Sequence, residues 1–149
     1  MNILQNLTTS WQFWALLSAM AAALTAIFAK LGVKGIPSDV ATFVRTVVIL
    51  AFVSVLLYVS GQFGLVKTLP RRAIGFLVLS GVATGVSWIC YFRALDLGEA
   101  AKVASIDKLS VVLVAIIAFL FLKERLSVTE TAGVVLITVG AILVAIGNK

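Results

Sequence analysis

Five apolar runs follow one another along this chain, and no other feature of the sequence constrains its fold as strongly. They cover residues 11–31, 40–58, 74–92, 103–122 and 128–146. A helix rises about 1.5 Å per residue, so about 20 residues cross a hydrocarbon core about 30 Å thick. Backbone groups cannot stay unpaired in lipid, so each run is predicted to be a transmembrane helix. The expected fold is therefore an all-α membrane protein, a bundle of five helices in a single domain over residues 1–149.

Charge and composition exclude several classes of protein. Charged residues make up 12% of the chain, whereas a soluble domain carries about a quarter. The net charge of +6 comes from basic residues spread singly between apolar runs, which favours anionic lipid headgroups over nucleic acid as partners. The chain has no histidine and one cysteine, Cys90. A zinc or copper site, an intrachain disulfide and histidine-based catalysis are therefore not expected, and neither is a cofactor. The chain lacks a convergent set of titratable groups, so an enzyme is not expected.

Helix starts can be predicted at two places. Ser127 and Glu130 have capping-box spacing, so the fifth helix is predicted to begin there. Ser38 or Asp39 is expected to cap the second helix.

The first run could be a cleaved signal segment instead of a transmembrane helix. It is longer than a typical signal core, and residues 1–10 contain no lysine or arginine. A retained first helix is therefore expected.

Small residues recur at helical spacing in three of the five runs. Such stripes let helix backbones approach closely in lipid. A single pair would carry no information, because alanine and glycine are common in membrane helices, but three helices together predict packing faces. The stripes are Ser18, Ala22, Thr25 and Ala29 in the first run, Gly81 and Gly85 in the third, and Gly133, Gly140 and Gly147 in the fifth.

Lysine and arginine are almost evenly divided between the two ends of the predicted helices. The side that holds the N-terminus carries Lys67, Arg71, Arg72, Lys123 and Arg125, and the other carries Lys30, Lys34, Arg93, Lys102, Lys108 and Lys149. Arg45 adds to the second side if it reaches the surface. Since such residues set orientation, the balance fits insertion in both directions. A fixed topology set by the translocon, by loop details or by a partner is the alternative. Two oppositely inserted copies would form the inverted repeats typical of transporters.

Nearly the whole chain, and its second half above all, resembles the EamA-type domain of the drug/metabolite transporter superfamily. The order and spacing of its motifs carry the resemblance: residues 28–32 (FAKLG), 91–95 (YFRAL), 98–101 (GEAA), 103–110 (VASIDKLS) and 122–127 (LKERLS), with Glu130, Gly133 and Gly140. Most relatives carry two such domains, so the chain resembles the single-domain bacterial and archaeal members. The resemblance implies a secondary transporter of small solutes in the cytoplasmic membrane, in which two inverted five-helix units form the pathway.

The same features leave the mechanism open. The expected form is an antiparallel homodimer that works by alternating access, and this chain is one half of it. Two alternatives are a non-transporting subunit of a larger membrane complex and one half of a heterodimeric flippase for lipid-linked sugars. The small multidrug resistance proteins, a neighbouring family, carry a proton-exchanging glutamate in their first helix. Residues 11–31 contain no acid, so that site cannot be carried over.

Three charged residues inside the runs require an explanation, because charge in a bilayer is costly. Arg45 and Asp107 lie roughly 6–8 Å from the start of their runs, on the same side, so they are predicted to pair in a substrate site. Lys108 could join them, but it could equally reach the interface. The remaining candidates for the pathway are Trp88, Tyr91 and Ser110. The two rings could stack on a solute, or they could belong to an interfacial aromatic belt.

Overall fold

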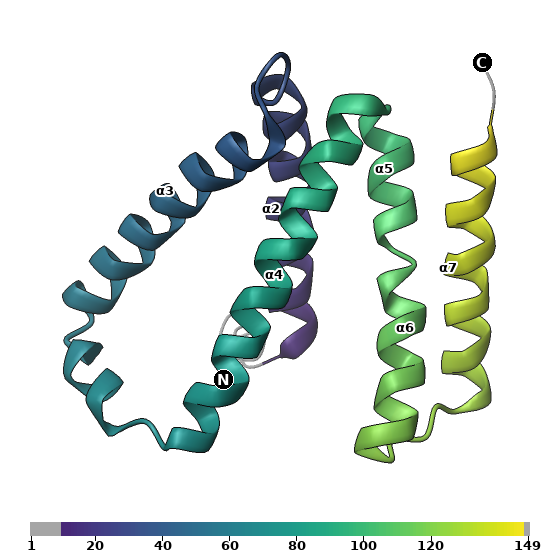
Figure 1. The fold of residues 1–149 in the computed structure, drawn as a ribbon. Coiled ribbons are helices and arrows are strands. Elements are labelled where there is room, and N and C mark those ends of the chain that lie inside the picture. The colour runs from purple at the N-terminus through teal and green to yellow at the C-terminus, as the bar shows by residue number, and fades with distance from the viewer. Residues whose placement is uncertain (1–9, 148–149) are drawn as a thin grey trace, which may run out of the picture. The chain divides into compact units, whose positions relative to one another are not determined.

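The computed structural model describes residues 10–147, and all of their regular structure is helical (Figure 1). Five helical segments are long and apolar enough to cross a membrane. The prediction of an all-α bundle of five transmembrane helices is confirmed. Lys149 lies outside the described residues. The elements are α2 (Trp11–Gly32), α3 (Ser38–Val59), η1 (Gln62–Thr68), α4 (Arg71–Leu97), α5 (Ala100–Asp107), α6 (Ser110–Ile117), η2 (Ala118–Leu122) and α7 (Val128–Ile146).

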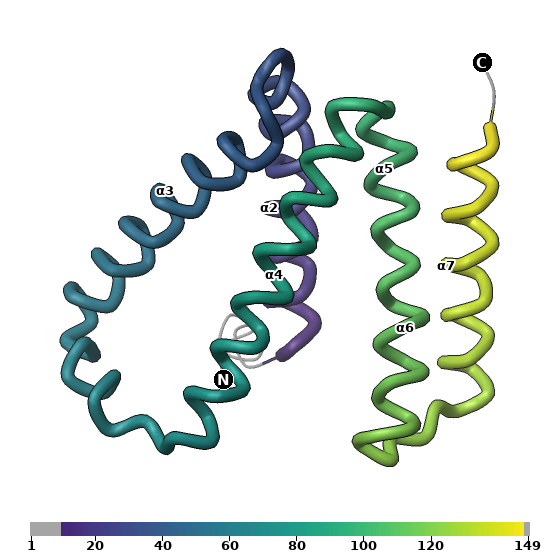
Figure 2. Tube along the Cα trace, viewed as in Figure 1, coloured from purple at the N-terminus to yellow at the C-terminus, as the bar shows by residue number. Residues whose placement is uncertain are grey.

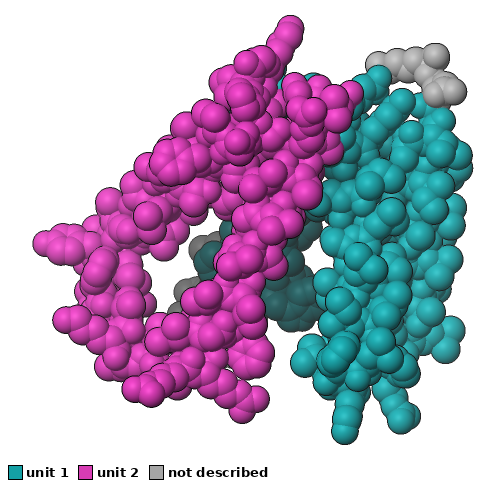
Figure 3. Space-filling model, viewed as in Figure 1, with its two compact units in different colours: residues 1–31, 98–149 teal, residues 32–97 magenta. Residues whose placement is uncertain are grey.

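The chain forms two compact units, coloured separately in Figure 3. We call Gly32–Leu97 the hairpin unit and the remainder, Met1–Leu31 with Gly98–Lys149, the terminal unit. In the hairpin unit α3 packs against α4, and η1 connects them. In the terminal unit α5 and α6 both pack against α7. Lys30 near the end of α2 donates a hydrogen bond to the carbonyl of Gly98, with an N–O distance of 2.9 Å.

The third helix is longer than the sequence predicted. The prediction was residues 74–92, whereas α4 has 27 residues and includes Arg71, Arg72 and Arg93. Apolar residues alone mark the part of a helix that lies in hydrocarbon. Basic side chains at the ends extend to the headgroups while their backbone stays helical, so a search for apolar runs underestimates the helix.

Of the two predicted helix caps, one is confirmed and the other prediction is wrong. Ser127 caps α7 as predicted: the amide of Glu130 donates to Ser127 Oγ at 3.2 Å, and the amide of Ser127 donates to Glu130 Oε2 at 2.7 Å. The predicted cap by Ser38 or Asp39 is wrong, because α3 already begins at Ser38 and Pro37 occupies the cap position. Pro37, with φ −54° and ψ 137°, leads directly into the helix, and its carbonyl accepts from the amide of Ala41 at 3.1 Å.

The fourth span, Ala100–Leu122, is interrupted, whereas the sequence predicted one continuous helix from 103 to 122. A turn at Lys108 and Leu109 separates α5 from α6. Amides there bond three residues back: Leu109 to Ile106 at 2.9 Å and Val111 to Lys108 at 3.0 Å. This is a tightened 3₁₀ geometry, which often marks a hinge or local strain. Figure 2 shows that the chain keeps nearly the same direction through the turn.

The glycines of α4 and α7 do not form close packing faces within their own units. A Cβ built on Gly81, Gly85, Gly133 or Gly140 would meet no other atom within 4 Å. Within each unit these four glycines therefore make no close helix contact, and beyond the unit the packing faces stay a prediction. Periodicity identifies a face that permits close approach, but it cannot say which molecule makes the approach.

Candidate functional site

Arg45 in the hairpin unit lies against two aromatic rings. Its guanidinium carbon lies 4.3 Å from the centre of the Trp88 ring and 5.5 Å from the centre of the Phe92 ring. Arg45 and Trp88 are half-buried, and Phe92 is buried. Each such cation–π contact contributes about 0.5–1 kcal/mol when exposed and about 2 kcal/mol when desolvated. The rings therefore compensate part of the cost of a charge within a span.

The local sequence explains why these residues meet. Arg45 lies about 10 Å along α3 from Ser38, and Trp88 lies nine residues before the end of α4. Consecutive helices that pack as a hairpin place the start of one beside the end of the other. Trp88 and Phe92 are four residues apart and so share one face of α4. The cluster thus follows from the hairpin.

Neighbouring hydroxyl groups on α3 are already satisfied. Thr42 Oγ1 donates to the carbonyl of Ser38 at 2.7 Å, and Thr46 Oγ1 donates to the carbonyl of Thr42 at 2.8 Å. These bonds to the preceding turn satisfy polar groups that would otherwise face apolar surroundings. The guanidinium of Arg45 consequently remains the strongest hydrogen-bond donor on this part of α3.

The structure brings together part of the predicted site and adds one residue. Arg45 and Trp88 are in contact, and Tyr91 interacts electrostatically with Arg45. The added residue is Phe92, which was not predicted as a site residue. Its side chain is buried, with 3% exposed. Its spacing from Trp88 was the available signal, because two aromatic residues four apart share one helix face and can both contact the same cation.

The other three predicted residues gather at the interruption of the fourth span. Asp107 ends α5, Ser110 begins α6, and Lys108 lies in the turn between them. Lys108 Nζ lies 3.8 Å from Asp107 Oδ2, so these two neighbouring residues form an ion pair. Both side chains are well exposed, at 43% and 59%, and such a pair contributes little to stability. The pairing of Asp107 with Arg45 joins different units and stays a prediction.

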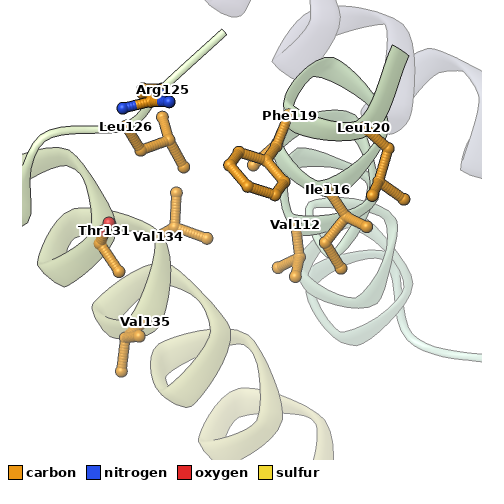
Figure 4. A pocket seen from close by; sticks show the side chains of 10 residues that line it. Val112, Ile116, Phe119, Leu120, Arg125, Leu126, Thr131, Val134 and Val135 are labelled. Carbon is orange, nitrogen blue, oxygen red and sulfur yellow. The ribbon is translucent and has the colours of Figure 1, made fainter. Parts of the chain in front are cut away.

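A groove in the terminal unit has a different character. It has a volume of about 630 Å³ and lies between α6 with η2 on one side and α7 on the other (Figure 4). Phe119 and Val134 face it, and Arg125 lies at one end. Its other walls are apolar apart from Thr131, whose hydroxyl donates to the carbonyl of Ser127 at 3.0 Å. None of the predicted site residues lines this groove. Apolar walls suit acyl chains or another helix, so the Arg45 cluster is the better site for a polar solute.

Comparisons with known proteins agree with this architecture. Residues 9–146 match the EamA-like transporter family. An uncharacterized transporter of a Sinorhizobium species, named for its position in the cobO 3′ region, is 54% identical over 140 residues, which cover 94% of this chain and 99% of that protein. An uncharacterized protein of Methanocaldococcus jannaschii is 28% identical over 78 residues, 52% of this chain and 57% of that protein. No solved structure matches. Both the extent of the family match and the identity to the Sinorhizobium protein show that this chain belongs to the EamA-like transporter family.

Proposed function

We propose that the chain is a secondary transporter of small polar solutes in the cytoplasmic membrane, and that it works by alternating access as an antiparallel homodimer. The observation that carries the proposal is Arg45, a cation held within a span by Trp88 and Phe92. An ionisable residue inside a membrane protein most often marks a substrate or ion pathway. A permanently charged arginine in a chain of a transporter family fits a pathway better than a purely structural role.

Three features support a second copy in the opposite orientation. The spans within residues 10–147 are odd in number, which places the two ends of this stretch on opposite sides, so two inverted copies reproduce an inverted repeat. The near balance of lysine and arginine permits both orientations. The faces at Gly133 and Gly140 on α7 are open within the terminal unit and allow close approach by another helix.

The interrupted fourth span supports alternating access. Discontinuous helices near the substrate site are common in transporters built from inverted repeats. The turn at Lys108 and Leu109 allows α5 and α6 to change their relative angle without breaking a long run of i→i+4 hydrogen bonds. A hinge of this kind would let the two ends of the span move separately while the cavity changes the side to which it opens.

Flux measured with the purified chain alone in liposomes tests the proposal. We expect concentration-dependent and saturable uptake of at least one class among amino acids, polyamines, nucleosides and sugars. A ligand-stabilisation screen selects the solutes, since a ligand that binds the native state raises its apparent stability. If uptake required a second, different five-helix protein, a heterodimer would replace the homodimer. Absence of uptake with or without such a partner would leave a non-transporting subunit as the better function.

Topology is tested separately by two reporters fused after Lys149, one active only inside the cell and one only outside. Both should give comparable signals, because the lysine and arginine bias is close to zero. Lysines added near Thr8 should shift the ratio strongly toward one reporter. A reporter that stays silent at normal expression would show one fixed orientation and contradict the antiparallel dimer.

A further inference from the structure

We propose that Arg45, stacked on Trp88 and Phe92, is the subsite that binds an acidic group of the transported solute, a carboxylate or a phosphate. The inference rests on the proposed transport function and goes further by naming the chemistry of the substrate. It is carried by the geometry of the cluster, by the charges around it and by a second cation–π pair in the same unit, which serves as a contrast.

The geometry leaves the donors of Arg45 available. Two rings lie 4.3 and 5.5 Å from the guanidinium carbon of Arg45 and restrict the positions that its head group can take. The five N–H groups point outward in the guanidinium plane, in a fork that matches the two oxygens of a carboxylate or phosphate. Because the rings restrict the head group before a ligand arrives, less side-chain entropy is lost on binding.

The ion pairs of the described residues do not supply a counter-charge for Arg45. Within residues 10–147, the ion pairs join Arg93 to Asp96 and Lys108 to Asp107, each at 3.8 Å, and neither includes Arg45. Aromatic rings stabilise a cation, but they do not neutralise it. A cation about 10 Å along a span needs an anion or water to limit the cost of its position. An acidic solute supplies that anion only while it is bound, which makes the site selective for charge.

Arg72 shows what an ordinary interfacial arginine looks like in the same unit. Its guanidinium carbon lies 5.9 Å from the centre of the Phe76 ring, and Arg72 is the second residue of α4. At the very start of a helix the side chain reaches headgroups and water directly. Arg45 contacts two rings and lies farther along its helix, so simple snorkelling explains it less well. Arg72 is thus the matched control for Arg45.

Trp88 can report binding beside Arg45. The chain contains three tryptophans, so Trp11→Phe with Trp14→Phe leaves Trp88 as the only one. In detergent, emission from Trp88 and the thermal unfolding temperature are measured with paired probes that differ only in the acid: succinate against succinamide, and glycerol 3-phosphate against glycerol. We expect at least one acid to shift the emission and raise the unfolding temperature, while its neutral counterpart does neither.

Substitutions then assign the effect to Arg45. Arg45→Lys should weaken binding of that acid by about tenfold, because lysine keeps the charge but loses the bidentate fork, and Arg45→Gln should abolish it. Arg72→Lys and Arg72→Gln should bind as the parent does. A response that survives Arg45→Gln, equal responses to acid and neutral probes, or no response to either acid would overturn the proposal. Circular dichroism identifies any variant that does not fold, and Arg45→Lys keeps the test available if Arg45→Gln is one.

Two further arms separate the remaining sources of an anion. In nanodiscs, replacing phosphatidylcholine by phosphatidylglycerol should leave Trp88 emission unchanged; a shift with lipid and none with soluble acids would assign Arg45 to a lipid headgroup instead. In liposomes, flux is measured independently of binding. Acid binding at Arg45 without flux would refute transport and leave the subsite intact, whereas flux without acid binding would refute the subsite and leave transport intact.

Discussion

The two units of this chain hold charge within a span in different ways. In the hairpin unit α3 is uninterrupted, and Arg45 is held by rings from the neighbouring helix. In the terminal unit the fourth span breaks at the position of its charges, and Asp107 and Lys108 pair with each other across adjacent residues. The first arrangement fixes a side chain on rigid helices. The second places the charges where the backbone itself is irregular.

This difference assigns different roles to the two charged positions. Rigid elements hold binding groups more precisely than turns do, so Arg45 is suited to recognition. A tightened turn inside a span is suited to movement, so the region of Asp107, Lys108 and Ser110 is suited to a change of conformation. Asp107 is also the acid within the spans best placed to carry a proton, if transport is coupled to protons.

The largest expected effect comes from removing the two cations in turn. Arg45→Ala should reduce flux by at least about tenfold, because a hydrogen bond to a charged group contributes about 1.5–3 kcal/mol. Lys108→Ala should reduce it by less than about fivefold, since exposed ion pairs contribute about 1 kcal/mol at most. Flux in liposomes, normalised to inserted protein, measures both. Equal losses would mean that the two units do not divide recognition and movement as proposed.

A double-mutant cycle between Arg45 and Asp107 is expected to show a smaller effect. Their matching depth along the sequence predicts a pair, whereas their separate partners in the structure predict independence. If each residue acts through its own partners, the losses from Arg45→Ala and Asp107→Ala should add within about 0.5 kcal/mol. A double mutant that loses clearly less than the sum would establish the pair and would remove Arg45 as a free anion subsite.

Helix starts provide a third contrast between the units. Ser127 caps α7 with a complete capping box, whereas Ser38 Oγ in the hairpin unit is buried without a hydrogen-bond partner. Ser127→Ala should cost about 1 kcal/mol of unfolding free energy. Ser38→Ala should be neutral or stabilising by up to about 1 kcal/mol, because it removes an unsatisfied polar group. Unfolding in mixed micelles, followed by circular dichroism, compares them. A cost at Ser38 equal to that at Ser127 would contradict the assigned caps.

These contrasts show what the sequence could predict. The five spans and the Ser127 cap were predictable, because apolar length and the spacing of Ser127 and Glu130 act locally. The break at Lys108 was not, because the tightened turn has no glycine or proline to mark it. Phe92 was missed for another reason. The contact of its ring with Arg45 depends on how α3 packs on α4, and no local pattern specifies that packing.

The smallest expected effect concerns positive φ angles, at which the units again differ. The hairpin unit places glycine there, with φ 77° at Gly35 and 67° at Gly61, whereas the terminal unit ends its fourth span with Lys123 at φ 58°. A side chain in this region costs about 1–2 kcal/mol, but glycine also gains entropy when unfolded, about 0.5–1 kcal/mol. Lys123→Gly should therefore stabilise the chain by roughly 0.5 kcal/mol. A Cβ at Gly61 would meet no atom within 4 Å, so Gly61→Ala should cost about 1 kcal/mol through the backbone alone. If Lys123→Gly destabilises instead, the lysine side chain contributes more at that end of the span, through headgroup contacts, than its backbone conformation costs.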